Sequence, residues 1–124
     1  VEEIYALTPT GAVKWKRDYG ANAQMTTVLT VTKDSIYGVL SEVEPGVTLG
    51  SITLPMSVTN GAVVIDKATG DIVARDPTPD SSLTELILSP RGELFLTALG
   101  IYEVLTLDDG ARDPVGGLRK YALK

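Results

Sequence analysis

The chain has 124 residues, 44% hydrophobic and 22% charged, with a formal net charge of −5 at pH 7, which is typical of one folded globular domain. It contains no Cys and no His, which excludes disulfides, Cys-ligated metals and the Ser-His-Asp and Cys-His catalytic arrangements within the chain. The acidic balance, with its basic residues scattered, argues against nucleic-acid binding.

Short β-prone runs separated by turn residues follow one another along the chain. "TTVLTV" and "SIYGVL" flank the polar turn "TKD", and "AVVID" and "DIVAR" flank "KATG", where Gly70 can take a positive φ. No stretch keeps a 3.6-residue period long enough for a helix. We therefore predict an all-β protein with strands at 4–8, 12–17, 25–31, 35–40, 62–66, 71–75, 84–88, 93–97 and 118–123.

The strands belong to a tandem repeat. Tyr5-Ala6-Leu7 aligns with Val63-Val64-Ile65 at a shift of 58 positions (63 minus 5), and again with Tyr121-Ala122-Leu123 (121 minus 63). At the same shift, residues 25–37 align with 83–95 without a gap, and Lys33 falls on Arg91. Each unit then has four strands in meander order, which we name A, B, C and D.

Tandem four-stranded antiparallel units are the blades of β-propellers. We expect one domain, 1–124, with strands C and D of one blade at 1–20, a second blade at 21–80 and a third, incomplete blade at 81–124. The alternative is a small β-sandwich with fortuitous internal similarity. About two blades and a half do not close a ring, which needs about 4–8 blades.

The two ends of the chain would leave strands without partners from their own blades. The chain begins at Val1 without Met, so we interpret it as a mature or excised piece. Either it is a fragment of a longer propeller, or several chains complete each other's blades. In both cases open strand edges favour self-association of the isolated chain.

The segment "VIDKATGDIVA" (64–74) resembles the repeat of pyrroloquinoline-quinone-type propellers, whose signature runs roughly A-x-D-x-x-T-G-x-x-x-W. The signature positions fall on Val64, Asp66, Thr69-Gly70 and Ala74. The first copy, "ALTPTGAVKW", keeps Ala6, Thr10-Gly11 and Trp15, with Thr8 in place of Asp and a turn one residue shorter.

The resemblance implies a structural role for the matching residues. In that family the Trp side chain docks between neighbouring blades, which implies the same position for Trp15. At the equivalent position of the next blade the chain has Ala74, so no large side chain would fill the contact between that blade and its neighbour. Of the signature residues, we expect a blade-docking role for Trp15, Gly11, Asp66, Thr69 and Gly70.

Each unit carries about twenty extra residues between strands B and C, at 41–60 and 98–117. Long insertions on a rigid scaffold often bind partners, although these two could instead only cover blade edges. Within the first, "VTLGSITL" can form a hairpin around Gly50-Ser51. In the second, Asp108, Asp109 and Asp113 surround Gly110 and are weak candidates for a Ca²⁺ site, but their spacing differs from known Ca²⁺ loops and also suits a solvated turn.

These features favour a non-catalytic scaffold that presents its insertions to a protein or peptide. We predict no catalytic residue and no bound cofactor. The longest uncharged stretch, 45–65, is interrupted by Pro and Gly and is a poor membrane span. The resemblance implies a bacterial envelope or cell-surface protein, in the periplasm or outside the cell.

Two enzymatic alternatives remain open at this point. The family also includes quinone-dependent dehydrogenases, which hold the quinone with a Trp floor, adjacent Cys residues, Ca²⁺ and a catalytic Asp. This chain lacks the Cys pair and a Trp outside strand D. The interpretation as a lactonase-like or lyase-like propeller is supported only by the segment "LSPRGELFLT" (88–97).

Overall fold

The computed structural model describes residues 3–78, 86–99 and 116–122, and within them it contains antiparallel strands and no helix. The all-β prediction is confirmed. The strands are β1 (Glu3–Leu7), β2 (Val13–Asp18), β3 (Ala23–Met25), β4 (Thr30–Val31), β5 (Ser35–Leu49), β6 (Ile52–Asp66), β7 (Ile72–Thr78), β8 (Ile87–Leu88), β9 (Glu93–Leu99) and β10 (Gly116–Ala122).

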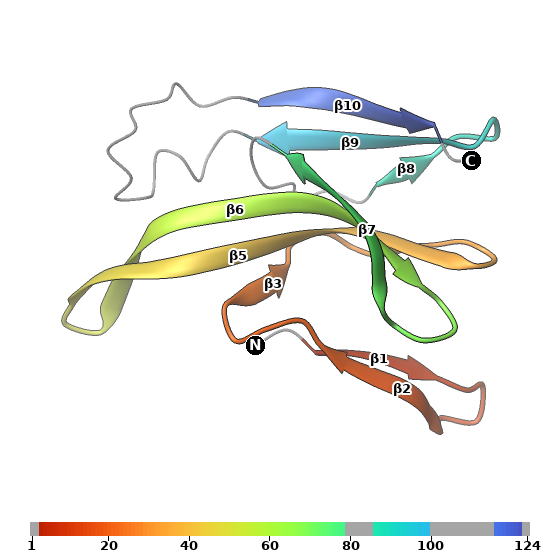
Figure 1. The fold of residues 1–124 in the computed structure, drawn as a ribbon, viewed down its shortest axis with the longest axis horizontal. Helices are drawn as coiled ribbons and strands as arrows, with labels where there is room; N and C mark the ends of the chain where they lie inside the picture. Colours follow the sequence, from red (N-terminus) through yellow and green to blue (C-terminus); the bar gives the residue numbers. More distant parts are fainter. Residues whose placement is uncertain (1–2, 79–85, 100–115, 123–124) are drawn as a thin grey trace.

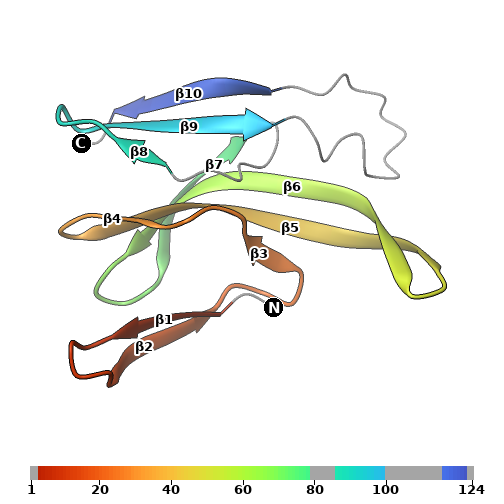
Figure 2. The ribbon, with the colours of Figure 1, turned by 180° about the vertical axis from the view of Figure 1, so that it is seen from behind.

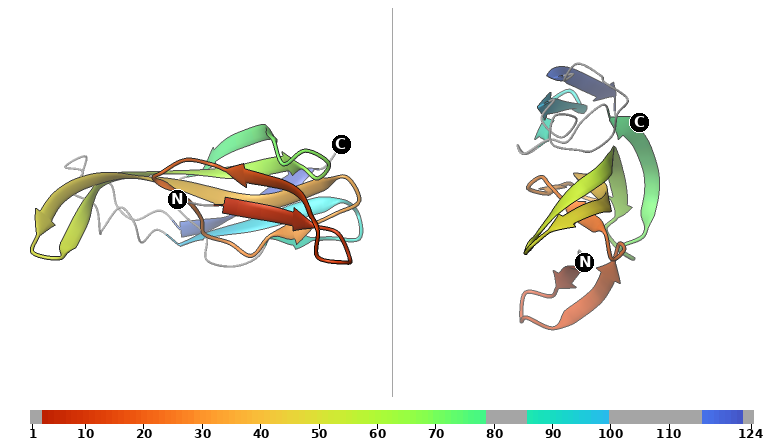
Figure 3. Two further views of the ribbon diagram at one scale, coloured as in Figure 1. Left: turned by 90° about the horizontal axis from the view of Figure 1, so that it is seen from below. Right: turned by 90° about the vertical axis from the view of Figure 1, so that its left-hand side faces the viewer.

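The strands form three open sheets that lie one above the other (Figure 1, Figure 3). The first is the hairpin β1–β2, and the third has the order β8–β9–β10. In the middle sheet the order is β3–β5–β6–β7, and β4 also pairs with β5. With β3 and β4 taken together as the one strand that was predicted at 25–31, neighbours in the sheets are neighbours in the sequence, which is the predicted meander order.

The predicted strand 25–31 is interrupted, and β3 and β4 lie along the same edge of β5 (Figure 2). Between them the Thr27 hydroxyl accepts a hydrogen bond from the Val39 amide at 3.0 Å, in place of a backbone partner. The interrupted segment packs closely over Gly38, where a Cβ would lie 2.8 Å from the Met25 sulfur and 2.9 Å from Leu29 Cδ2. The side chains of this segment occupy the space that Gly38 leaves.

The middle sheet is packed on both faces. Alternation along β5 and β6 places Ile36, Leu40, Val63 and Ile65 on the face toward β1–β2, together with Trp15. The opposite face carries Tyr37, Val39, Ala62 and Val64, which contact Leu86, Leu94 and Leu96 of the third sheet. Each seam between sheets therefore has its own hydrophobic cluster.

The turns that follow β1 and β6 have the same construction. Gly11 N–H donates to the Thr8 carbonyl at 2.9 Å, and Gly70 N–H donates to the Asp66 carbonyl at 2.8 Å. In the shorter turn the Thr8 hydroxyl accepts from Ala12 N–H at 3.0 Å, while the Asp66 carboxylate accepts from the amides of Ala68 and Thr69. Thr8 and Asp66 thus both accept backbone amides of their own turn, Thr8 from the residue four positions on and Asp66 from the residues two and three positions on.

The insertion 41–60 is strand rather than loop, which corrects the predicted boundaries of strands B and C at 40 and 62. β5 and β6 pair in an almost unbroken register from Ser35↔Asp66 to Leu49↔Ile52. The hairpin turn lies at Gly50-Ser51, as predicted, and Gly50 has a φ of 65° while no non-Gly residue in the described part has a positive φ. This combination is typical of a type II′ turn, in which Gly takes the first central position.

The part of the chain that the structure describes contains no helix with the length and apolar character needed to cross a membrane.

Candidate functional site

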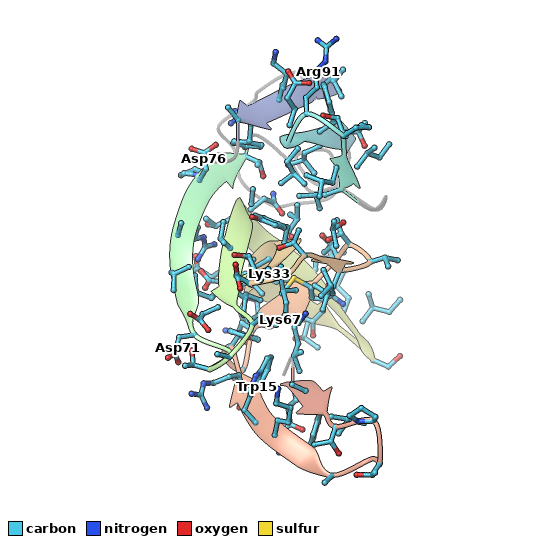
Figure 4. All side chains as sticks on the ribbon, turned by 90° about the vertical axis from the view of Figure 1, so that its right-hand side faces the viewer. Trp15, Lys33, Lys67, Asp71, Asp76 and Arg91 are labelled. Carbon is cyan, nitrogen blue, oxygen red and sulfur yellow. The ribbon has the colours of Figure 1, made fainter. Side chains whose placement is uncertain are left out.

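Trp15 lies in the seam between the first and middle sheets (Figure 4). Its side chain is buried, and its indole N–H donates to the Lys67 carbonyl at 2.9 Å. Lys67 belongs to the turn between β6 and β7, 52 positions along the chain. The indole therefore joins the end of one repeat unit to a turn of the next, through both packing and a hydrogen bond.

The turn 66–71 is shaped to receive the indole. A Cβ at Gly70 would lie 2.6 Å from Trp15 Cε3 and 2.7 Å from Arg17 Cγ, so only a glycine permits this approach. The Tyr19 hydroxyl donates to the Gly70 carbonyl at 2.7 Å, and burial raises the pKa of Tyr19. Arg17 Nε donates to Asp71 Oδ1 at 3.1 Å across the same seam.

The remaining signature residues build these turns. Asp66 accepts two backbone amides, and the Thr69 hydroxyl accepts from Asp71 N–H at 3.2 Å. Hydrogen bonds from Thr69 and Arg17 hold the pKa of Asp71 below its ordinary value. Gly11 has a φ of 88° and no atom near its missing Cβ, so the equivalent turn of the first sheet contacts no indole.

Asp108, Asp109 and Asp113 lie outside the described residues, as does most of the second insertion, 98–117. Among the residues that are described, no group of three or more acidic side chains is arranged to hold a metal ion.

The first insertion forms a projecting ribbon, which we define as residues 43–58 of β5 and β6. Its turn end extends beyond the other strands (Figure 1, Figure 3). Val47, Leu49 and Ile52 are 51%, 62% and 64% exposed. Leu49 and Ile52 are paired across the ribbon and share one face, and Val47 lies beside them in the irregular stretch between Pro45 and Thr48. On the other face the hydroxyls of Thr48 and Thr53 lie 3.0 Å apart and share a hydrogen bond. The tip is therefore amphipathic, with its apolar side exposed.

The ribbon's edges are poorly suited to strand addition. β3 pairs with β5 only as far as Glu42, and β7 pairs with β6 only as far as Asn60. Beyond these points the ribbon carries Pro45 and Pro55 directly opposite each other, and the register shifts beside them. Proline has no N–H to offer an incoming strand and is a common protection of exposed edges.

A groove of about 340 Å³ lies at the base of the ribbon. The residues around it include Tyr19, Asn22, Glu42, Glu44 and Thr59. Arg75 Nη1 lies 3.3 Å from Glu42 Oε1 and offsets part of this acidic character. The carboxylates of the groove can accept hydrogen bonds at the base of the ribbon, at the end opposite to the apolar tip.

The opposite end of the sheets carries turns with basic residues. Lys33 and Arg91 occupy the turns before β5 and β9, which is the equivalence that the repeat predicts (Figure 4). A shallow hollow there is lined by Lys14, Lys33 and Lys67 but also by Asp34 and Asp66. Lys67 Nζ donates to the Thr32 carbonyl at 3.0 Å. The charges are balanced and the lysines are exposed, so this end offers no built anion site.

The hairpin around Gly50-Ser51 was predicted from the sequence, but its exposed apolar face and the groove at its base were not. The signal for the face was present, because "VTLGSITL" alternates apolar and polar residues across its central Gly-Ser turn. The groove had no such signal, since Tyr19 and Glu42 meet only after β3 packs along β5.

The chain matches no protein-family model, no curated protein and no solved structure.

Proposed function

We propose that the protein is a non-catalytic scaffold of the β-propeller type that binds a protein partner through the projecting ribbon. The observation that carries the proposal is the ribbon itself: two strands rooted in a sheet that is packed on both faces, holding three large apolar side chains in solvent at its tip. Exposed apolar patches that are held on rigid elements commonly mark protein interaction sites.

Two features support the propeller type. In both C–D turns a glycine N–H donates back to the carbonyl at the start of the turn, and Trp15 docks on the β6–β7 turn, as the resemblance to pyrroloquinoline-quinone-type propellers implies. The register also shifts at the same place in both sheets, between Ala6 and Leu7 and between Val64 and Ile65. A bacterial envelope or cell-surface location follows from that resemblance as part of the same proposal.

The partner should present apolar side chains to the tip and hydrogen-bond donors to the groove at the base. Aromatic and aliphatic anchors would cover Leu49 and Ile52, while Lys, Arg or amide groups would face Glu42. The threonine face of the ribbon should stay in solvent.

Site-specific photo-crosslinking in the cells that produce the protein tests this proposal. A benzophenone amino acid at Leu49 should give one discrete adduct, whereas the same residue at Val13, which is 57% exposed on β2, should give none. Equal adducts from both positions would refute a specific contact at the ribbon.

The adduct then allows a quantitative measurement. The triple variant Val47→Ser, Leu49→Ser, Ile52→Ser should weaken binding of the identified partner at least about tenfold. The Thr48→Ser, Thr53→Ser variant alters the opposite face and should bind as the wild type does. An unchanged affinity of the triple variant would contradict the proposal, provided that its melting temperature stays within a few degrees of the wild type, as expected for exposed positions.

A further inference from the structure

The two seams of the molecule differ at one equivalent position. Trp15 pairs with Ala6 across β1–β2, and Ala74 pairs with Val64 across β6–β7. Ala6 and Val64 are 58 positions apart (64 minus 6), which is the repeat length, and each pair precedes the same register shift. Ala74 therefore occupies in the second seam the place that the indole occupies in the first.

The second seam is hollow at this place. A cavity of about 210 Å³ that opens to solvent at Ala74 lies between the middle and third sheets. Most of its lining is apolar and includes Tyr37, Ala62, Val64 and Leu94, with Arg75 and Asp76 also among the lining residues. Ala62, Val64 and Tyr121 are only partly buried although they belong to the hydrophobic cluster of this seam. An apolar protein cavity of about 150 Å³ is enough to bind benzene, so this one has room for a larger ring system.

The rim of the cavity is held by polar contacts. Asp76 Oδ2 accepts from the Tyr121 hydroxyl at 2.7 Å and from Arg119 Nη1 at 3.2 Å, and these bonds join β7 to β10. Burial raises the pKa of Tyr121, so its hydroxyl remains a donor throughout the neutral range. These bonds link β7 of the middle sheet to β10 of the third sheet through Asp76, which is labelled in Figure 4.

We propose that this cavity is a binding site for a neutral planar aromatic group of about the size of indole. Between the first and middle sheets the spacing accommodates the Trp15 ring. Between the middle and third sheets a cavity is present at the equivalent position, and none of the described side chains fills it. A bound ring would contact Val64 and Leu94 and would fill the volume that an indole side chain at position 74 would take. This site is separate from the ribbon, so the inference does not depend on the proposed partner binding.

Titration of the ¹⁵N-labelled chain with indole, followed by amide chemical shifts, tests the inference. Saturable shifts should be confined to the cavity, at Ala62, Val64, Ala74 and Leu94, with a Kd below about 1 mM. A second arm uses a short blocked peptide with one central Trp: tighter binding of free indole assigns the site to a small molecule, and tighter binding of the peptide assigns it to a side chain of another protein. Absence of saturable shifts in both arms would overturn the inference.

Variants at two adjacent positions provide the matched control. Ala74→Trp should fill the cavity, raise the melting temperature by several degrees and reduce indole binding at least tenfold. Val73→Trp places the same side chain on a position that is 61% exposed, and it should leave both quantities unchanged. If Ala74→Trp does not fold, Ala74→Leu should still weaken indole binding several-fold. Equal binding by wild type and the folded position-74 variant would refute the site.

Discussion

Single residues decide how successive units are joined. Gly70 and Gly11 hold the same place in two turns and both have a positive φ, yet only Gly70 faces an indole. The Trp15 ring packs against Gly70, which has no Cβ, and its indole N–H donates to the Lys67 carbonyl. Both residues belong to the turn 66–71. The seam is therefore a fit between one side chain and one turn rather than a general apolar contact.

The pair of glycines gives a direct test at this scale. Gly11→Ala should cost only the left-handed conformation, about 1–2 kcal/mol. Gly70→Ala should cost a further 1–3 kcal/mol, roughly, because its Cβ overlaps the indole. Urea unfolding measures both. With Trp15→Ala, which should itself cost about 3–5 kcal/mol, the difference between the two glycine variants should shrink to what the contact with Arg17 Cγ leaves. A difference of unchanged size in that background would show that Trp15 is not its cause.

At the scale of elements, β5 has two distinct halves. From Ile36 to Ser41 every side chain position is buried between neighbouring sheets, whereas from Val47 to Leu49 the strand is exposed. The two halves share one partner, β6, and one register. The packed half anchors the ribbon, and the exposed half is free to contact another molecule.

Two leucines of this strand provide the corresponding prediction. Leu40 is 1% exposed and Leu49 is 62% exposed. Leu40→Ala should reduce the free energy of unfolding by about 2–5 kcal/mol, because it opens a cavity in the first seam. Leu49→Ala should change it by less than about 0.5 kcal/mol. Comparable losses from both variants would mean that the ribbon tip is covered by part of the chain itself.

At the scale of the whole molecule, the three sheets leave unpaired strands at their margins. Among the described strands, β1 pairs only with β2 and β10 pairs only with β9. Leu118 on β10 is 68% exposed. Open edges with exposed apolar side chains recruit further strands. The stacking of the sheets therefore favours association through these margins.

We expect the isolated chain to self-associate at tens of micromolar, as measured by light scattering after size-exclusion chromatography. Leu118→Lys places a charge on the margin of β10 and should shift the protein toward the monomer. Val28→Lys changes a residue of similar exposure, 66%, between β3 and β4, and should have no such effect. A monodisperse monomer for the wild type, or equal effects of both lysines, would contradict association through the margins.

The sequence by itself determined the all-β class, the strand order and the places of the turns. These follow from local chemistry: alternation of apolar residues marks strands, and Gly11, Gly50 and Gly70 supply the positive φ that their turns require. The similarity at a shift of 58 positions is also read from local residues, and its division into blades stays a prediction.

Only the tertiary structure decided what the segments contact. Residues 41–60 became strand because β5 and β6 pair with each other, a non-local gain that outweighs their Pro and Gly content. The acceptor for the Trp15 indole, the exposed side of the ribbon and the cavity beside Ala74 all depend on which faces of three sheets meet. The acceptor of the indole and the cavity join residues far apart in the chain, so no local pattern could specify them, whereas the alternation in "VTLGSITL" marked the apolar face of the ribbon but not its exposure.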